Sequence, residues 1–137
     1  MPVQTQTKRY REAIEESSKG RQLSGLFSII SNNLLLATEV LSTDYKVKTV
    51  SELEALSRKA RILAKELVSN TCNLSHDDIT EKISFLKNRM LLLVEDLTNE
   101  LGKLDTNKNS DKRAIEDIVL AKRLLRDSQR GLITIHD

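Results

Sequence analysis

Apolar residues recur at alternating steps of three and four along most of this chain. The clearest run lies in segment 49–69 and consists of Leu53, Leu56, Ala60, Leu63 and Leu67. On an α-helix these side chains form one narrow apolar stripe, because each residue turns the helix by about 100°. A helix with such a stripe has to pack against other helices, either of this chain or of a partner.

The same rhythm predicts four further helices. Segment 22–42 is apolar around so much of its circumference that it needs cover on two sides. Segment 76–104 contains roughly 25 residues of amphipathic helix, about 38 Å in length, and since a small bundle needs less, its far end is expected to project. Segment 7–20 predicts a short first helix, and segment 110–131 predicts the last one.

Local signals predict where several helices begin and end. Thr49 and Glu52 have the spacing of a capping box. Ser75 is a favourable N-cap, and the carboxylate of Asp78 suits the positive end of the helix that follows. Gly131 is placed to end the last helix. The remaining tail alternates apolar and polar residues, which leaves a frayed end or a strand added to a partner's sheet as alternatives.

Together these elements predict an all-α protein, a helical bundle of about five helices. The 137 residues suffice for one domain of ordinary size. We expect a disordered leader at 1–6, a helical docking domain at 7–104, and a C-terminal helix and tail at 105–137. Aromatic residues make up only 3% of the chain, so leucine and isoleucine must provide most of the packing.

Composition narrows the classes of function. The chain has 22 basic and 20 acidic residues, a balance that gives no electrostatic argument for nucleic-acid binding by itself. We find no apolar run of membrane-spanning length, so no membrane insertion is expected. The single cysteine, Cys72, has no partner for an internal disulfide, which fits a reducing compartment.

Residues that carry reaction chemistry do not form a recognisable pattern. His76 and His136 lie in a predicted turn and in the tail, without the spacing of metal ligands. Cys72 has no histidine near it in sequence that would make it a nucleophile. The glycines stand alone and form no phosphate-binding loop. We therefore expect no enzyme, no cofactor and no metal.

Two lines of basic residues follow helical spacing. They are Arg58, Arg61 and Lys65 in one helix, and Arg123, Arg126 and Arg130 in another. The second line is a candidate for weak, salt-sensitive contact with DNA phosphates. No aromatic residue stands among them, so bases have no stacking platform. A solvated helix face, or ion pairing with an acidic partner, is the alternative.

Several short motifs follow one another in a suggestive order. They are Tyr10-Arg11, Lys19-Gly20-Arg21, Ile30-Ser31-Asn32-Asn33-Leu34 with Val40, SELEALSRKARILAKEL, Asp77-Asp78-Ile79 and Lys82-Ile83-Ser84-Phe85-Leu86. This order resembles the N-terminal region of the kleisin called non-SMC element four, of the SMC five–six complex. The resemblance covers about residues 9–89. The family's winged-helix region has no counterpart here, nor do residues 90–137 match the family pattern, so the resemblance implies a fragment or a shortened relative.

The resemblance implies a non-enzymatic interaction subunit in chromosome maintenance, DNA recombination and DNA repair, located in the nucleus. The stripe of segment 49–69 would dock on the coiled-coil neck of the larger SMC arm. A MAGE-like non-SMC partner would contact Leu34, Leu35 and Val40 of segment 22–42. The alternative is a self-contained helical-bundle adaptor in membrane trafficking, located in the cytoplasm, with its apolar residues internal.

Overall fold

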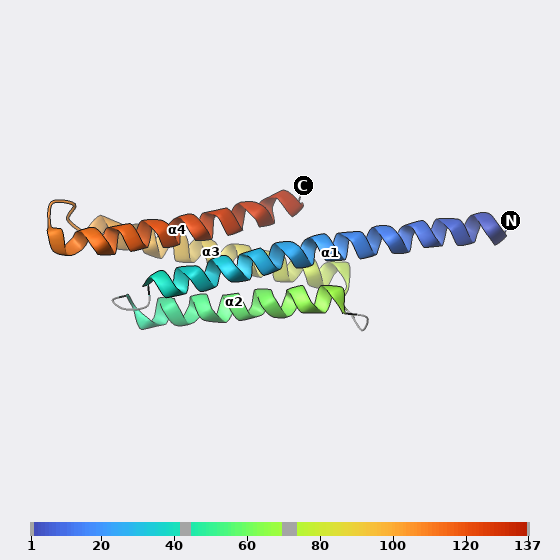
Figure 1. Ribbon diagram of the computed structural model, residues 1–137, viewed down its shortest axis with the longest axis horizontal. Coiled ribbons are helices and arrows are strands. Elements are labelled where there is room, and N and C mark those ends of the chain that lie inside the picture. Colours follow the sequence, from blue (N-terminus) through green and yellow to red (C-terminus); the bar gives the residue numbers. More distant parts are fainter. Residues whose placement is uncertain (1, 42–44, 70–73, 137) are drawn as a thin grey trace.

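The protein is an antiparallel bundle of long helices. The computed structural model describes the backbone of residues 2–41, 45–69 and 74–136, and the side chains of these ranges between 20 and 132. Four α-helices make up nearly all of this backbone: α1 (Pro2–Leu41), α2 (Val47–Val68), α3 (His76–Lys103) and α4 (Asn109–His136) (Figure 1). The predicted all-α bundle is confirmed, although it has four helices in the described part of the chain rather than five.

The helix count differs because segments 7–20 and 22–42 form one continuous helix. α1 is 40 residues long and passes through Gly20 without a break. It also includes residues 2–6, which the sequence had suggested as a loose leader. Gly20 marks a close approach of two helices instead of a helix end, because a Cβ atom there would lie 3.2 Å from the carbonyl oxygen of Leu67.

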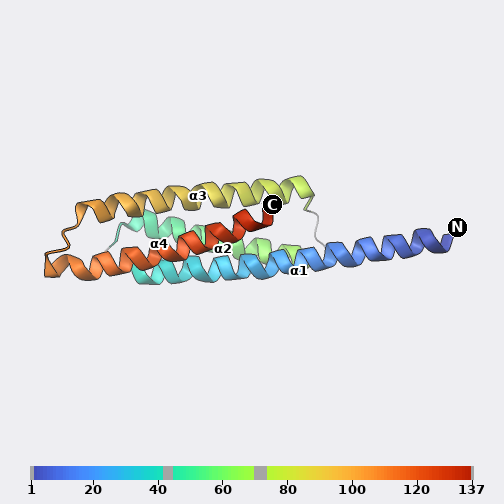
Figure 2. The same ribbon diagram turned by 90° about the horizontal axis from the view of Figure 1, so that it is seen from above.

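The helix that projects is α1, not segment 76–104. Two perpendicular views show the N-terminal part of α1 extending past the ends of the other three helices (Figures 1 and 2). α3 lies along α4, and its buried residues run from Ile83 to Leu97. The length of α3 is therefore used for packing within the bundle.

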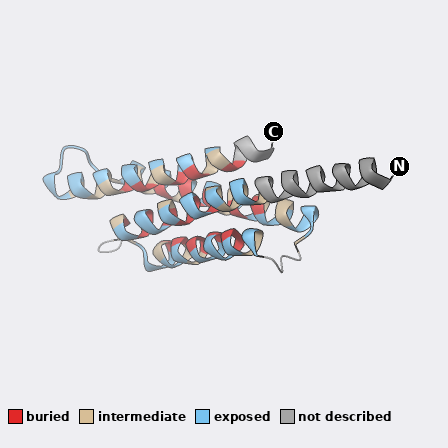
Figure 3. Ribbon diagram, turned by 45° about the vertical axis from the view of Figure 1, so that its right-hand side comes forward, coloured by how far each residue is buried: buried red, intermediate tan, exposed pale blue. Residues whose placement is uncertain are grey.

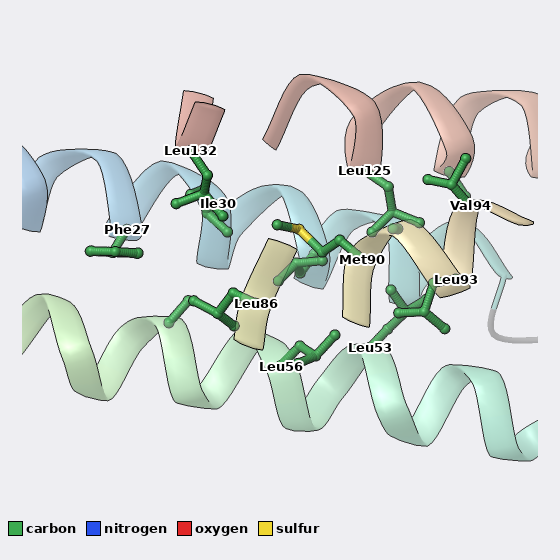
Figure 4. Close-up of a cluster of buried hydrophobic side chains, with 14 of the residues drawn as sticks. Phe27, Ile30, Leu53, Leu56, Leu86, Met90, Leu93, Val94, Leu125 and Leu132 are labelled. Carbon is green, nitrogen blue, oxygen red and sulfur yellow. The ribbon is translucent and has the colours of Figure 1, made fainter. Parts of the chain in front are cut away.

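α1 is the central helix of the bundle. It packs along both α2 and α4, and α4 packs along α3, whereas the backbones of α2 and α3 lie farther apart and these two helices meet through their side chains. The prediction that segment 22–42 needs cover on two sides is confirmed. Buried residues form a band on the inner faces of the helices (Figure 3), and leucine, isoleucine and methionine side chains from all four helices meet there (Figure 4). The largest fully buried side chains are Phe27, Ile30, Leu34, Leu53, Met90, Leu97, Leu125 and Leu132.

Small polar residues bring α1 and α2 close together. The hydroxyl of Ser24 donates a hydrogen bond to the carbonyl oxygen of Ala64 at 2.7 Å. The hydroxyls of Ser31 and Ser57 each donate to the other residue's carbonyl oxygen, both at 2.9 Å. Buried hydroxyls are tolerated here because each has a partner. These contacts need short side chains at the interface, so they fix the register of α1 on α2.

The predicted start of the third helix is confirmed, and that of the second is wrong. Ser75 caps α3 by accepting a hydrogen bond from the backbone N–H of Asp78, whose carboxylate accepts one from the Ser75 N–H. α2 begins earlier than predicted, after Lys46. Thr49 is therefore buried inside the helix and donates to the Asp96 carboxylate at 3.1 Å, while Glu52 pairs with Arg89. Both side chains serve tertiary contacts instead of a cap.

Gly131 does not end the last helix, because α4 continues to His136. A Cβ atom at Gly131 would lie 2.9 Å from Cδ1 of Leu26, so this glycine makes room for α1. The next residue, Leu132, is fully buried. Neither the frayed tail nor the added strand is observed in the described backbone.

One described segment, Gly20–Leu41, is long and apolar enough to cross a membrane by length and composition. The expectation that the chain has no apolar run of membrane-spanning length is therefore wrong. About 33% of its most apolar window is buried inside the bundle. Because the core helix of a soluble bundle has the same composition, this property alone does not place the helix in a membrane.

The glycines of α1 provide a matched test of the close α1–α2 contact. A Cβ atom at Gly25 would meet nothing within 4 Å. We expect Gly25→Ala to raise the free energy of unfolding by about 0.5–1 kcal/mol, because alanine loses less backbone entropy in a helix. Gly20→Ala should gain less, since its methyl group presses on the Leu67 carbonyl. Urea denaturation followed by circular dichroism measures both, and equal gains would contradict the close contact.

Candidate protein-interaction surfaces

The predicted docking stripe lies in the core of the chain's own bundle. Leu53, Leu56, Ala60 and Leu63 are buried, and Leu67 is partly buried against the core. A partner reaches this stripe only if the bundle opens. Sequence spacing identified a real apolar surface, but it had no information on which helix covers it.

The three residues predicted to meet a MAGE-like partner are not brought together at the surface. Leu34 is fully buried, and Val40 is partly buried. Leu35 is 41% exposed on the outer side of α1. Of the predicted partner-binding residues, Leu35 is therefore the one with a substantially exposed side chain.

An apolar groove that was not among the surfaces predicted from the sequence lies between α2 and α3. Its apolar lining consists of Ile62 and Leu63 from α2, and Phe85 and Leu86 from α3. We refer to it as the α2–α3 groove. The hollow has a volume of about 440 Å³, and Ile62 and Phe85 are 55% and 44% exposed. The signal in the sequence is the position of Ile62 and Phe85, each next to a buried leucine and thus at the edge of a core stripe.

The groove exists because each of its walls is held by a different neighbour. α2 is held close to α1 by the short serine and alanine side chains, and α3 packs on α4. Larger side chains separate α2 from α3. At the far end of these two helices, polar side chains join them instead.

That polar junction consists of side chains from the start of α2 and the second half of α3. The ammonium group of Lys46 lies 2.7 Å from a Glu100 carboxylate oxygen and 3.6 Å from Asp96. The hydrogen bond from Lys46 lowers the pKa of the Glu100 carboxyl group. Burial, and secondly the charge of Asp96, raise the pKa of Tyr45 nearby. The junction joins α2 to α3 at the end away from the groove, and the Glu52–Arg89 pair joins them between the junction and the groove.

Charged residues line the rim of the α2–α3 groove. The Lys59 ammonium group lies 4.3 Å from the centre of the Phe85 ring, within the range of a cation–π contact. Glu66 and Asp78 line the groove near the connection between α2 and α3, and Glu81 and Lys82 lie between these two ends. The groove thus has an apolar floor and a charged rim, as protein-binding grooves do.

The predicted basic line of α4 borders a second hollow. Arg123, Arg126 and Arg130 are exposed and line about 410 Å³ of space together with Lys122, which the sequence analysis did not include. Asp127 lines the same hollow and offsets part of the charge. The other basic line is separate, because Arg61 and Lys65 line a hollow between α1 and α2.

The residues considered for catalysis or metal binding do not form a site in the part of the chain that the structure describes. His76 is exposed in the first turn of α3. Cys72 and the side chain of His136 lie outside the described residues. Among the side chains that the structure describes, no three histidine, cysteine, aspartate or glutamate residues form a group suited to a metal ion.

In comparisons with protein families, characterised proteins and solved structures, nothing matches this chain. They lend support neither to the kleisin resemblance nor to the trafficking alternative. Both remain proposals, and the surfaces of the bundle are the observations that bear on them.

A comparison of two adjacent residues of α2 tests whether the groove is distinct from the core. Leu63 is 3% exposed, whereas Ile62 is 55% exposed. We expect Leu63→Ala to lower the free energy of unfolding by about 2–5 kcal/mol, because it leaves a cavity in the core. Ile62→Ala should cost about 1 kcal/mol at most, as a surface substitution. Chemical denaturation checks both values, and similar losses would show that the groove is part of the core.

Proposed function

We propose that this chain is a non-enzymatic protein-interaction module that takes up a helical segment of a partner in the α2–α3 groove. The observation that carries the proposal is the groove itself, an open apolar trough between two helices whose backbones are widely spaced. Single exposed apolar residues are normal on protein surfaces. A groove whose apolar lining comes from two neighbouring helices is typical of sites that bind an amphipathic helix.

The apolar lining is sufficient for a binding contribution of useful size. Fully burying an isoleucine or phenylalanine side chain is worth about 1.5–3 kcal/mol. Ile62 and Phe85 are about half exposed, so covering both yields about 1.5–3 kcal/mol in total. Because 1.4 kcal/mol is a factor of ten in affinity, loss of either contact is measurable.

The kleisin resemblance proposes specific partners for such a module. These are the coiled-coil neck of an SMC arm and a MAGE-like subunit, with a role in chromosome maintenance and DNA repair in the nucleus. A coiled-coil neck presents helices, which is the type of segment that suits the α2–α3 groove. Under this proposal Ile62 and Phe85 replace the buried leucine stripe as neck contacts, and Leu35 remains the exposed candidate for the MAGE-like partner.

The second candidate is a self-contained adaptor bundle in membrane trafficking. Burial of the leucine stripe inside the bundle favours it, since this candidate expects internal apolar residues. Sedimentation of the pure chain separates the two candidates. A compact monomer that does not bind an SMC neck supports the adaptor, and a chain that binds the neck supports the kleisin-like subunit.

Two isoleucines provide a matched test of the groove. Ile62 in the groove and Ile29 on the outer side of α1 are 55% and 58% exposed. We expect Ile62→Asp to weaken binding to a purified SMC neck coiled coil at least about tenfold, because a carboxylate enters an apolar contact. Ile29→Asp should leave the affinity unchanged.

Isothermal titration measures both affinities, and thermal melting verifies that both variants remain folded. Equal weakening by the two variants would show that the groove is not the binding site. Binding by neither the variants nor the unmodified chain would exclude the SMC neck as the partner.

We also propose weak contact between the basic line of α4 and DNA phosphates. Each neutralised phosphate releases counterions, so the affinity for a DNA duplex should fall steeply with salt. Arg123→Ala combined with Arg126→Ala should reduce the magnitude of the salt slope by about 2. Arg58→Ala combined with Arg61→Ala has the same spacing and charge change, and should leave the slope unaltered. Fluorescence anisotropy at several salt concentrations provides the slopes, and equal reductions would contradict a site on α4.

A further inference from the structure

We infer that the occupant of the α2–α3 groove is an amphipathic helix with an acidic first turn and a basic last turn, running parallel to α2. This inference rests on the proposed function and specifies the chemistry and direction of the partner segment. It derives from the distribution of charge along the groove.

Charge changes sign from one end of the groove to the other. Glu66 lies in the last turn of α2 and Asp78 in the first turn of α3, so both are at the end where these helices connect. Lys59 lies about two turns away, over the Phe85 ring. Seven residues separate Lys59 from Glu66, which is about 10 Å along the helix. Glu81 and Lys82 between them are neighbours of opposite charge and largely cancel.

The charges at the two ends are available to a ligand. Among the described residues, neither Lys59 nor Glu66 forms an ion pair. Asp78 accepts one hydrogen bond from the backbone N–H of Ser75 and retains further acceptor capacity, since a carboxylate has about four acceptor sites. A bound helix therefore gains charge contacts without breaking any ion pair described in the bundle.

The charge gradient selects a direction. A basic turn of the occupant is favoured against Glu66 and Asp78, and an acidic turn is favoured beside Lys59. Helices commonly carry acidic residues in the first turn and basic residues in the last, because these charges stabilise the helix dipole. An occupant of this kind places its C-terminal end at the connection between α2 and α3. α2 also ends there, so the occupant runs in the same direction as α2.

A designed peptide serves as the probe. It has about 14 residues, or four turns, which span the apolar floor and both charged ends. Leucines at steps of three and four form its apolar face, with glutamates in the first turn and lysines in the last. Two versions carry a nitroxide spin label, one at the N-terminal end and one at the C-terminal end.

Paramagnetic broadening of backbone amide signals in the full chain reports the direction of the bound peptide. We expect the C-terminal label to broaden amides near Val68 and Asp78 most strongly. The N-terminal label should broaden those near Leu56 and Arg89 instead. Equal broadening of both regions by both labels would overturn the inferred direction.

A charge swap within α2 tests whether the charges of the groove set the direction of the bound peptide. Lys59→Glu combined with Glu66→Lys leaves the net charge unchanged, makes the Lys59 end acidic, and offsets Asp78 with a lysine at the other end. The basic turn of the peptide is then favoured at the Lys59 end, so the broadening patterns of the two labels should exchange. Glu54→Arg combined with Arg58→Glu is the control, because it swaps charges on the same helix outside the groove lining. The control should keep the original pattern. An unchanged direction in the first variant would show that charge does not orient the peptide.

Failure of the inference differs from failure of the proposed function. If the peptide binds the unmodified chain but not Ile62→Asp, the groove binds helices, and the labels alone decide the direction. If the peptide does not bind the unmodified chain, both proposals are overturned. A dimer in sedimentation that Ile62→Asp dissociates would show that a second copy fills the groove, which also overturns a charged partner helix.

Discussion

The close contact between α1 and α2 is the constraint on which the rest of the bundle depends. Ser24, Ser31 and Ser57 are small enough to let the two backbones approach, and each hydroxyl donates to a carbonyl oxygen across the interface. Longer side chains at these positions would push the helices apart and leave the buried carbonyl contacts unmade. Because α2 is held against α1, it stays separate from α3.

That separation produces the surface with the clearest functional potential. α3 packs on α4, and polar side chains join α2 to α3 at the end where Lys46 meets Asp96 and Glu100. At the other end the groove retains exposed Ile62 and Phe85. The chain therefore buries a core of its own and still exposes an apolar groove on one side. The groove results from the unequal spacing of the helices, so no single sequence motif predicts it.

The leucine stripe of α2 illustrates how the same residues support two hypotheses. Its spacing shows that one side of the helix must be buried, and this requirement is met within the chain by α1 and its neighbours. Docking on a partner would satisfy the same requirement. A kleisin-like role therefore does not depend on the stripe, and in the folded bundle it relies on the residues at the edge of that stripe.

The sequence by itself determined the helical class, the residues that must be buried on each helix, and the Ser75 cap, because periodicity and capping are local properties. It did not determine the roles of Gly20, Thr49 and Gly131, since each looks like a helix end locally but contacts a residue far away in the chain. The groove likewise required the tertiary structure. Ile62 and Leu63 are adjacent and similarly apolar, and only the position of α3 decides that one is exposed and the other is buried.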